Sequence, residues 1–155
     1  MLTEPTGTRP VGFNAFWLRG TPKSLEILQD LGFLYHIDDV SRDEPFTVTV
    51  RGRPFAVVPY TLRNNDMVRY DSPALTVGAY TAELKAEFDQ LYQEAAVRRR
   101  MMSISTHDRI SGMPARVRAL AEFIDYSQQH ADVRFMRKDE IARWALTQAD
   151  TARES

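Results

Sequence analysis

Apolar residues recur at helical spacing in four parts of the chain. The first pattern follows Thr21-Pro22, a capping residue and a proline suited to a helix start, and it ends at Gly32; its apolar positions are Leu25, Leu28 and Leu31. Amphipathic stretches predict three further helices, over residues 81–97, about 115–130 and 139 to about 146.

Short apolar runs between these helices predict strands. Residues 46–50 alternate with period two, Arg51-Gly52 supplies a turn and residues 55–59 are apolar, which together predict a hairpin. Further strands are expected at residues 10–13, 33–35, 101–105 and 133–136. Residues 61–72 are unusually polar, so a long surface loop is expected there.

The alternation of strands and helices is typical of the α/β class. With 155 residues, of which 43% are hydrophobic and 26% charged, the chain has enough apolar surface for one core without disulfides or a structural metal. We therefore expect a single α/β domain across residues 1–155, with an ordered core over about residues 10–146 and a polar C-terminal tail.

Charge and cysteine content narrow the possible functions. The 20 basic and 21 acidic residues leave a formal charge of −1, which argues against a nucleic-acid partner or a polybasic membrane surface. Because the chain has no cysteine, disulfide frameworks, thiolate zinc sites and iron–sulfur clusters are excluded. No apolar run is long enough to span a bilayer and no secretory signal is recognisable, so a cytoplasmic location is expected.

His107 is the first candidate for acid–base chemistry. It follows the strand predicted at residues 101–105, and active residues of α/β proteins gather where strands end. An imidazole exchanges protons near neutral pH, although from spacing alone a histidine that only hydrogen-bonds its turn is favoured. His36, His107 and His130 are too far apart in sequence for a paired-histidine metal motif, so we expect no metal site.

Acidic side chains cluster within residues 38–44, directly after the strand predicted at 33–35. They are candidates for an acid/base or cation site, but composition favours a solvated loop. For the aromatic residues Phe13, Phe16 and Trp17, core packing is the commoner fate.

Several motifs in one order resemble the polysaccharide deacetylase family, in the NodB-type branch of allantoinase-like and peptidoglycan-deacetylase-like enzymes. The motifs are Arg19-Gly20-Thr21-Pro22, Gly32-Phe33-Leu34-Tyr35 with Asp38, Asp43-Glu44-Pro45-Phe46, Val58-Pro59-Tyr60-Thr61-Leu62 with Asn65-Asp66-Met67, Phe88-Asp89-Gln90-Leu91-Tyr92, Met101-Met102-Ser103-Ile104 with His107, Gly112 with Pro114, and residues 139–144. The resemblance implies a partial or distorted (β/α) barrel. It also implies hydrolysis of carbon–nitrogen bonds in N-acetylated sugars, ureides or cyclic amides.

The resemblance further implies roles for single residues. Arg19 matches an arginine that orients a catalytic carboxylate, and Asp38 and Asp43 fall in a segment that positions catalytic groups. His107 matches the histidine that acts as general acid toward the leaving amine. Trp17, Asn65 and Asp66 are expected to contact the substrate. Asp108, where the family has a small or neutral residue, either pairs with the imidazole or disturbs the pocket.

Two family motifs that normally precede the arginine motif are not found in this sequence: the aspartate base with its metal ligand, and the paired histidines. The chain therefore resembles the C-terminal half of the catalytic domain, and a divalent, zinc-like metal is expected only together with the missing motifs. A partial barrel leaves sheet edges exposed, which predicts a homo-oligomer or a complementary N-terminal-half chain as partner. Two hypotheses follow: a hydrolase half completed by another chain, or a catalytically inactive interaction module or relic.

Overall fold

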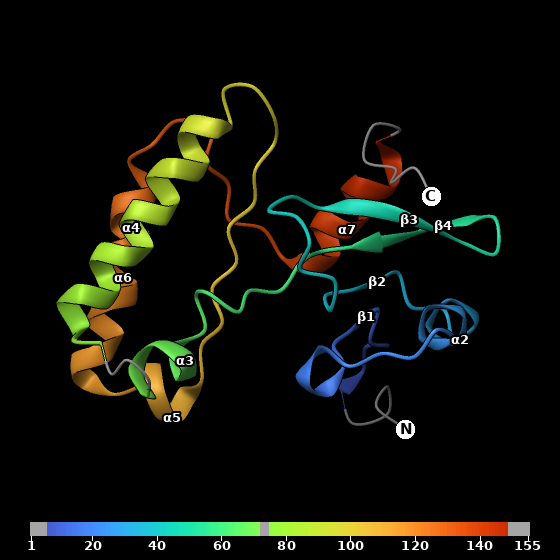
Figure 1. Ribbon diagram of the computed structural model, residues 1–155, viewed down its shortest axis with the longest axis horizontal. Helices are drawn as coiled ribbons and strands as arrows, with labels where there is room; N and C mark the ends of the chain where they lie inside the picture. The colour runs from blue at the N-terminus through green and yellow to red at the C-terminus, as the bar shows by residue number, and fades with distance from the viewer. Residues whose placement is uncertain (1–5, 72–74, 149–155) are drawn as a thin grey trace. The chain divides into compact units, whose positions relative to one another are not determined.

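The computed structural model describes residues 6–71 and 75–148, which form two compact units (Figure 1). The first unit contains the described residues up to Pro59 together with those from Met136 onward, and the second contains the described residues of Tyr60–Phe135. Each unit is described by itself, and the expectation of a single domain stays a prediction. Most of the polar tail predicted beyond residue 146 lies outside the described residues.

An open mixed sheet forms the centre of the first unit, in the order β1-β2-β4-β3. Its strands are β1 (Gly12–Phe13), β2 (Tyr35–His36), β3 (Phe46–Val50) and β4 (Arg53–Val57). β1, β2 and β4 run parallel, whereas β3 runs antiparallel to β4. The sheet and its covering helices confirm the expected α/β class.

The predicted hairpin is confirmed at β3 and β4. Arg51 and Gly52 connect the strands and both have positive φ, 47° and 74°, as two-residue hairpin turns with the twist of the strands require. The Arg51 guanidinium also donates to Asp30 and Glu26 of the helix α2 (Ser24–Asp30), at 2.8 and 2.6 Å.

Helices cover this sheet. The predicted leucine helix is α2 (Ser24–Asp30), and its Leu28 packs against Val50 and Phe55 of the hairpin. α7 (Lys138–Thr147) packs against β4 and β3 with its alanines buried. A short 3₁₀ turn, η1 (Phe16–Leu18), lies between β1 and α2.

The second unit is helical. α4 (Val77–Glu94) and α6 (Pro114–Gln128) pack side by side, as Figure 1 shows, and confirm the two long amphipathic helices predicted for this region. Thr76 caps α4 by accepting the Ala79 N–H at 3.2 Å. Two shorter helices, α3 (Asp66–Asp71) and α5 (Asp108–Ser111), complete the unit, whose core includes Leu84, Phe88 and Phe123.

The surface loop predicted over residues 61–72 is confirmed only in part: residues 61–65 are irregular and include exposed Leu62 and Arg63, residues 66–71 are helical, and residue 72 lies outside the described residues. Asp66 begins α3, and Asn64, Asn65 and Asp66 are buried rather than solvated. Polarity was misleading because these side chains are hydrogen-bonded inside the unit, and a paired polar group is buried at little cost.

The strands predicted at 101–105 and 133–136 are wrong. In the first, only Ser105 pairs, as an isolated parallel bridge with Asn65. In the second, Phe135 and Met136 are exposed and no pairing occurs among the described residues, so an apolar run without a neighbouring strand stays irregular. The strand predicted at 33–35 is displaced, because β2 begins only at Tyr35.

Two expectations about solvation are reversed. The Asp38 side chain is only 12% exposed, so this part of the acidic stretch is not a solvated loop. Phe16 and Trp17, for which core packing was the commoner expectation, are 83% and 70% exposed, and the substrate contact predicted for Trp17 stays a prediction.

Candidate active site

A buried carboxylate organises one group of predicted site residues in the second unit. Asp66 is fully buried. Its Oδ2 accepts the His107 backbone N–H at 2.7 Å and the Ser111 hydroxyl at 2.6 Å. Its Oδ1 lies 2.6 Å from Nδ1 of the His107 ring. Three donors thus converge on one carboxylate.

The backbone brings Asp66 and His107 together although 41 positions separate them in sequence. Ser105 and Asn65 form the isolated parallel bridge, in which Asp66 N–H donates to Ser105 C=O and Ser105 N–H donates to Asn64 C=O, each at 3.0 Å. Asn65 Oδ1 accepts the Met67 N–H at 2.9 Å, which caps the start of α3. Asp66 is therefore one residue beyond paired Asn65, and His107 is two residues beyond paired Ser105.

A second layer of hydrogen bonds holds this bridge in place. The Tyr60 hydroxyl donates to Ser105 Oγ at 2.6 Å and accepts from Asn65 Nδ2 at 2.8 Å. Asn64 Nδ2 donates to Glu87 of α4 at 2.8 Å. Because both ends of the Asn65 amide are already bonded, its visible role is to hold the start of α3.

The hydrogen bonds decide the charge of Asp66. Burial alone would raise its pKa, but the bonds from the His107 backbone, the Ser111 hydroxyl and the His107 ring outweigh burial and hold the pKa below its usual value. An ionised carboxylate only accepts hydrogen bonds, so Nδ1 of His107 carries a proton toward Asp66. Nε2 is then the ring nitrogen left for a reacting group, on a side chain that is 26% exposed.

Asp108 has a different position from Asp66. It lies in the first turn of α5, where its Oδ1 accepts the Arg109 N–H at 2.7 Å. The carboxylate bonded to the His107 ring is thus that of Asp66.

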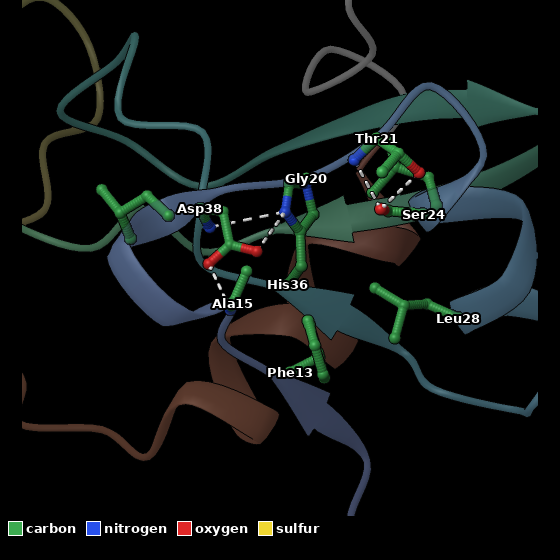
Figure 2. A pocket seen from close by; sticks show the side chains of 10 residues that line it. Phe13, Ala15, Gly20, Thr21, Ser24, Leu28, His36 and Asp38 are labelled. Carbon is green, nitrogen blue, oxygen red and sulfur yellow. Dashed lines mark hydrogen bonds and ion pairs between the residues drawn. The ribbon is translucent and has the colours of Figure 1, made fainter.

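Asp38 lies in the first unit, beside a pocket of about 200 Å³ (Figure 2). Its Oδ1 accepts the Ala15 N–H at 2.9 Å and the Asn14 amide at 2.8 Å. The pocket also takes in His36 and apolar side chains from β1, η1 and α2; its lining residues are Phe13, Ala15, Leu18, Gly20, Thr21, Ser24, Leu25, Leu28, His36 and Asp38.

The other predicted residues of the first unit do not line this pocket. Arg19 is exposed directly after η1, and Asp43 is half-buried ahead of β3. Trp17 packs edge-on against Phe16, with ring centroids 5.9 Å apart, in a left-handed backbone conformation of φ 56°. The assigned roles of Arg19, Asp43 and Trp17 remain predictions.

Sequence reasoning missed several residues that the geometry brings forward. Ser111 was not singled out, Asp66 was assigned to substrate contact rather than to His107, and His36 was weighed only as a metal ligand. One signal for Asp66 was available: Asn65 followed by Asp66 is a good helix start, with a capping residue and then an acid in the first turn.

No group of three or more histidine, aspartate or glutamate side chains within the described residues could hold a metal ion. None of the described helices is long and apolar enough to cross a bilayer.

Comparison with known proteins identifies relatives of this chain. No family model matches the chain. A Schizosaccharomyces pombe protein described as a polysaccharide deacetylase is 30% identical over an alignment of 132 residues, and the match covers 76% of this chain and 41% of that protein.

Three solved structures are similar to this chain over most of its length. A protein of Pseudomonas aeruginosa PAO1 described as a polysaccharide deacetylase has a TM-score of 0.81 and 39% identity, covering 92% of this chain and 48% of its own. PuuE allantoinase has a TM-score of 0.82 and 39% identity, covering 94% and 49%. A Mycobacterium smegmatis protein, at 23% identity and a TM-score of 0.80, shares the fold.

The open α/β sheet is thus part of a NodB-type (β/α) barrel. The chain belongs to the polysaccharide deacetylase family, which confirms the resemblance, and it spans about half the length of the relatives it matches.

Proposed function

We propose that the chain is part of a hydrolase of carbon–nitrogen amide bonds, in which His107 is the general acid. The observation that carries this proposal is the 2.6 Å bond between Nδ1 of His107 and the buried Asp66 carboxylate. A carboxylate that fixes the ring's orientation and stabilises its charged form makes Nε2 a suitable proton donor.

The proton transfer follows from this geometry. Once water has added to an amide carbonyl, the leaving nitrogen must be protonated before the carbon–nitrogen bond breaks. His107 donates that proton from Nε2, while Asp66 holds Nδ1 and stabilises the imidazolium. Asp66 is then a positioning residue rather than a substrate contact, because it is fully buried and all its bonds are internal.

The group that activates the water lies, in this proposal, outside the His107 cluster. A second copy of the chain or a complementary chain is the proposed source, and no step is assigned to a metal. Because the relatives are described as polysaccharide deacetylases and an allantoinase, an N-acetylated sugar and a ureide are the two proposed substrate classes.

The test is hydrolysis by the purified chain, alone and mixed with a candidate partner, of N-acetylglucosamine oligomers and of allantoin. Released acetate and consumed allantoin are measured. His107→Ala is expected to lower the rate by about 10²–10⁴-fold, the usual worth of a general acid. His130→Ala is the matched control, since His130 packs among Phe88, Tyr92 and Tyr126. Equal activity of His107→Ala and wild type would reject the assignment, and no turnover under any condition would favour the non-catalytic module.

A further inference from the structure

Two large aromatic side chains of the first unit are exposed, although such residues are normally buried. Phe16 is 83% exposed and Trp17 is 70% exposed. Their rings pack edge-on against each other on the short turn η1, with centroids 5.9 Å apart. Trp17 and Leu18 also have left-handed backbone, with φ of 56° and 55°, which is unfavourable for residues that have a Cβ atom. A strained turn that presents two rings to solvent points to a use of these rings outside the unit.

The pocket of the first unit lies beside this turn. Its volume is about 200 Å³, and Leu18, the residue after Trp17, is one of its walls. Figure 2 shows Phe13, Leu28 and Asp38 on different sides of the pocket, and Trp17 is not among the described residues that line it. An apolar cavity of about 150 Å³ takes up benzene, so the space is large enough for an aromatic ring. The unit thus has an exposed ring and a space for a ring next to each other.

The polar groups of the pocket suit an indole. The walls are mostly apolar, and Asp38 adds one carboxylate, which is 12% exposed. The hydrogen bonds that Asp38 accepts from Ala15 and Asn14 both go to Oδ1. A carboxylate has about four lone-pair sites, so Oδ2 can accept a further hydrogen bond. A buried tryptophan needs an acceptor for its ring N–H, which makes Trp17 rather than Phe16 the ring that fits.

We propose that the chain forms a two-fold dimer in which the Trp17 ring of each copy enters the first-unit pocket of the other copy. The indole N–H donates to Asp38, and the rest of the ring packs against the apolar walls. An exposed ring and a receiving pocket side by side make one surface complementary to itself, as a two-fold interface requires. The dimer does not depend on the proposed hydrolysis, so it is tested without an activity measurement.

The area of this interface is enough for a weak dimer. Phe16 and Trp17 together expose about 300 Å² of side chain per copy, since one aromatic side chain can bury about 150–250 Å². Each copy both inserts a ring and receives one, so the interface buries about 1,200 Å² in total, the lower limit for stable complexes. We therefore expect a Kd of about 10–100 µM.

The first experiment measures association of the wild-type chain over about 1–500 µM by sedimentation velocity. The mass should rise from the 17.8 kDa of the monomer toward twice that value. The two tryptophans give two indole N–H signals in a ¹H–¹⁵N spectrum, and Trp17→Ala identifies that of Trp17. This signal should move with concentration while that of Trp144 stays in place. A monomer at every concentration, or a Trp17 signal independent of concentration, would overturn the proposal.

Two variants remove the two halves of the contact. Trp17→Ala removes the ring, and Gly20→Leu fills the pocket, because its Cβ would meet Ser24 at 3.5 Å, an ordinary contact. Each variant alone should dimerise at least about 30-fold more weakly, the effect of removing one hot-spot residue. Val97→Ala is the matched control, since Val97 is 87% exposed in the second unit and should not affect the Kd.

Mixing the two variants distinguishes this dimer from general stickiness. A ¹⁵N-labelled Gly20→Leu copy keeps Trp17, and an unlabelled Trp17→Ala copy keeps an open pocket, so one of the two insertions can form. The Trp17 indole signal of the labelled copy should move on addition of Trp17→Ala and stay in place on addition of unlabelled Gly20→Leu. Movement with both additions, or with neither, while circular dichroism shows both variants folded, would reject the proposal.

Discussion

The two units each contain a histidine next to an aspartate, and the two pairs are built in opposite ways. At His107 the carboxylate is buried and fixed by three donors, while the imidazole is 26% exposed. At His36 the imidazole itself is buried, and the group facing its Nδ1 within hydrogen-bond distance is a backbone N–H.

This difference changes what each ring can do. Where the carboxylate is the buried partner, as at Asp66, its hydrogen bonds hold its pKa below the usual value, and the imidazole bonded to it is partly exposed. Where the imidazole is the buried partner, as at His36, burial penalises its charged form and lowers its pKa. Burial therefore opposes the charge of a different partner in each pair: the carboxylate of Asp66 in one unit and the imidazole of His36 in the other.

The largest expected effect comes from neutralising each carboxylate in turn. Asparagine at position 66 offers one acceptor oxygen to three donors, so Asp66→Asn is expected to disturb the His107 tautomer and lower the proposed turnover by about 10²–10⁴-fold. Asp38→Asn should lower the pKa of His36 further, because the Asp38 carboxylate beside the ring raises it against the effect of burial.

Histidine ¹⁵N spectra and the pH profile of turnover measure these changes together. A merely structural role of Asp66 would lower the amount of folded protein without moving the pH profile. Equal tautomer changes in the two variants would remove the contrast between the pairs.

A second test compares stability. Asp66→Ala leaves the His107 N–H and the Ser111 hydroxyl without their buried acceptor, and breaking a buried charged network costs about 3–5 kcal/mol. The measurement is urea unfolding of both the variant and wild type. Asp43→Ala is a suitable control in the first unit, because that residue is only half-buried. A loss under about 1 kcal/mol for Asp66→Ala would mean that the network is not kept in solution.

Helices and turns whose residues are characteristic by themselves could be predicted from the sequence. The leucine spacing of α2, the turn at Arg51-Gly52 and the long stripes of α4 and α6 depend on neighbours in sequence. The predicted strand at 101–105 failed because a strand needs a partner, and only Ser105 has one. The periodicity of apolar residues indicates which face of a segment is buried, but it does not indicate whether another strand lies beside that segment.

The site was harder to predict for the same reason. His107 was found from its position after an apolar run, but its partner Asp66 lies 41 positions away in what looked like a polar loop. Only the pairing of Asn65 with Ser105 shows that Asp66 is the carboxylate beside the ring. For His36, no sequence pattern reveals that Nε2 is buried and lacks a hydrogen-bond partner among residues 6–71 and 75–148.

The pH dependence of stability should separate the two pairs into two windows. His36 has a lowered pKa in the folded chain, so its contribution is complete above about pH 6.5, the unfolded value, and is lost as the pH falls toward the lowered pKa. Asp66 also has a lowered pKa, so its contribution is complete above about pH 4 and is lost at more acid pH.

Urea unfolding of wild type, His36→Phe and Asp66→Asn at a series of pH values measures these windows. The difference between wild type and His36→Phe should change below about pH 6.5, and that between wild type and Asp66→Asn should change below about pH 4. The first difference removes the contributions of His107 and His130, whereas the second removes only those of groups that do not contact Asp66, because the His107 ring is bonded to its carboxylate. If both differences changed in one window, the two pairs would not be electrostatically distinct.

The smallest effect is expected for Ser111→Ala. This variant tests whether the three hydrogen bonds to Asp66 act independently of one another. The Ser111 hydroxyl donates to Oδ2, while the ring bonds Oδ1, so Ser111→Ala removes one of three donors without touching the tautomer. The loss of one hydrogen bond to a charged group costs about 1.5–3 kcal/mol of unfolding free energy, at the low end here because the His107 N–H still satisfies Oδ2. The pKa of Asp66 should rise toward its usual value, which shifts its stability window to higher pH. Urea unfolding and the ¹³C shift of the Asp66 carboxyl follow both changes. A His107 tautomer altered by Ser111→Ala would show that the donors act on the carboxylate as one unit and not through separate oxygens.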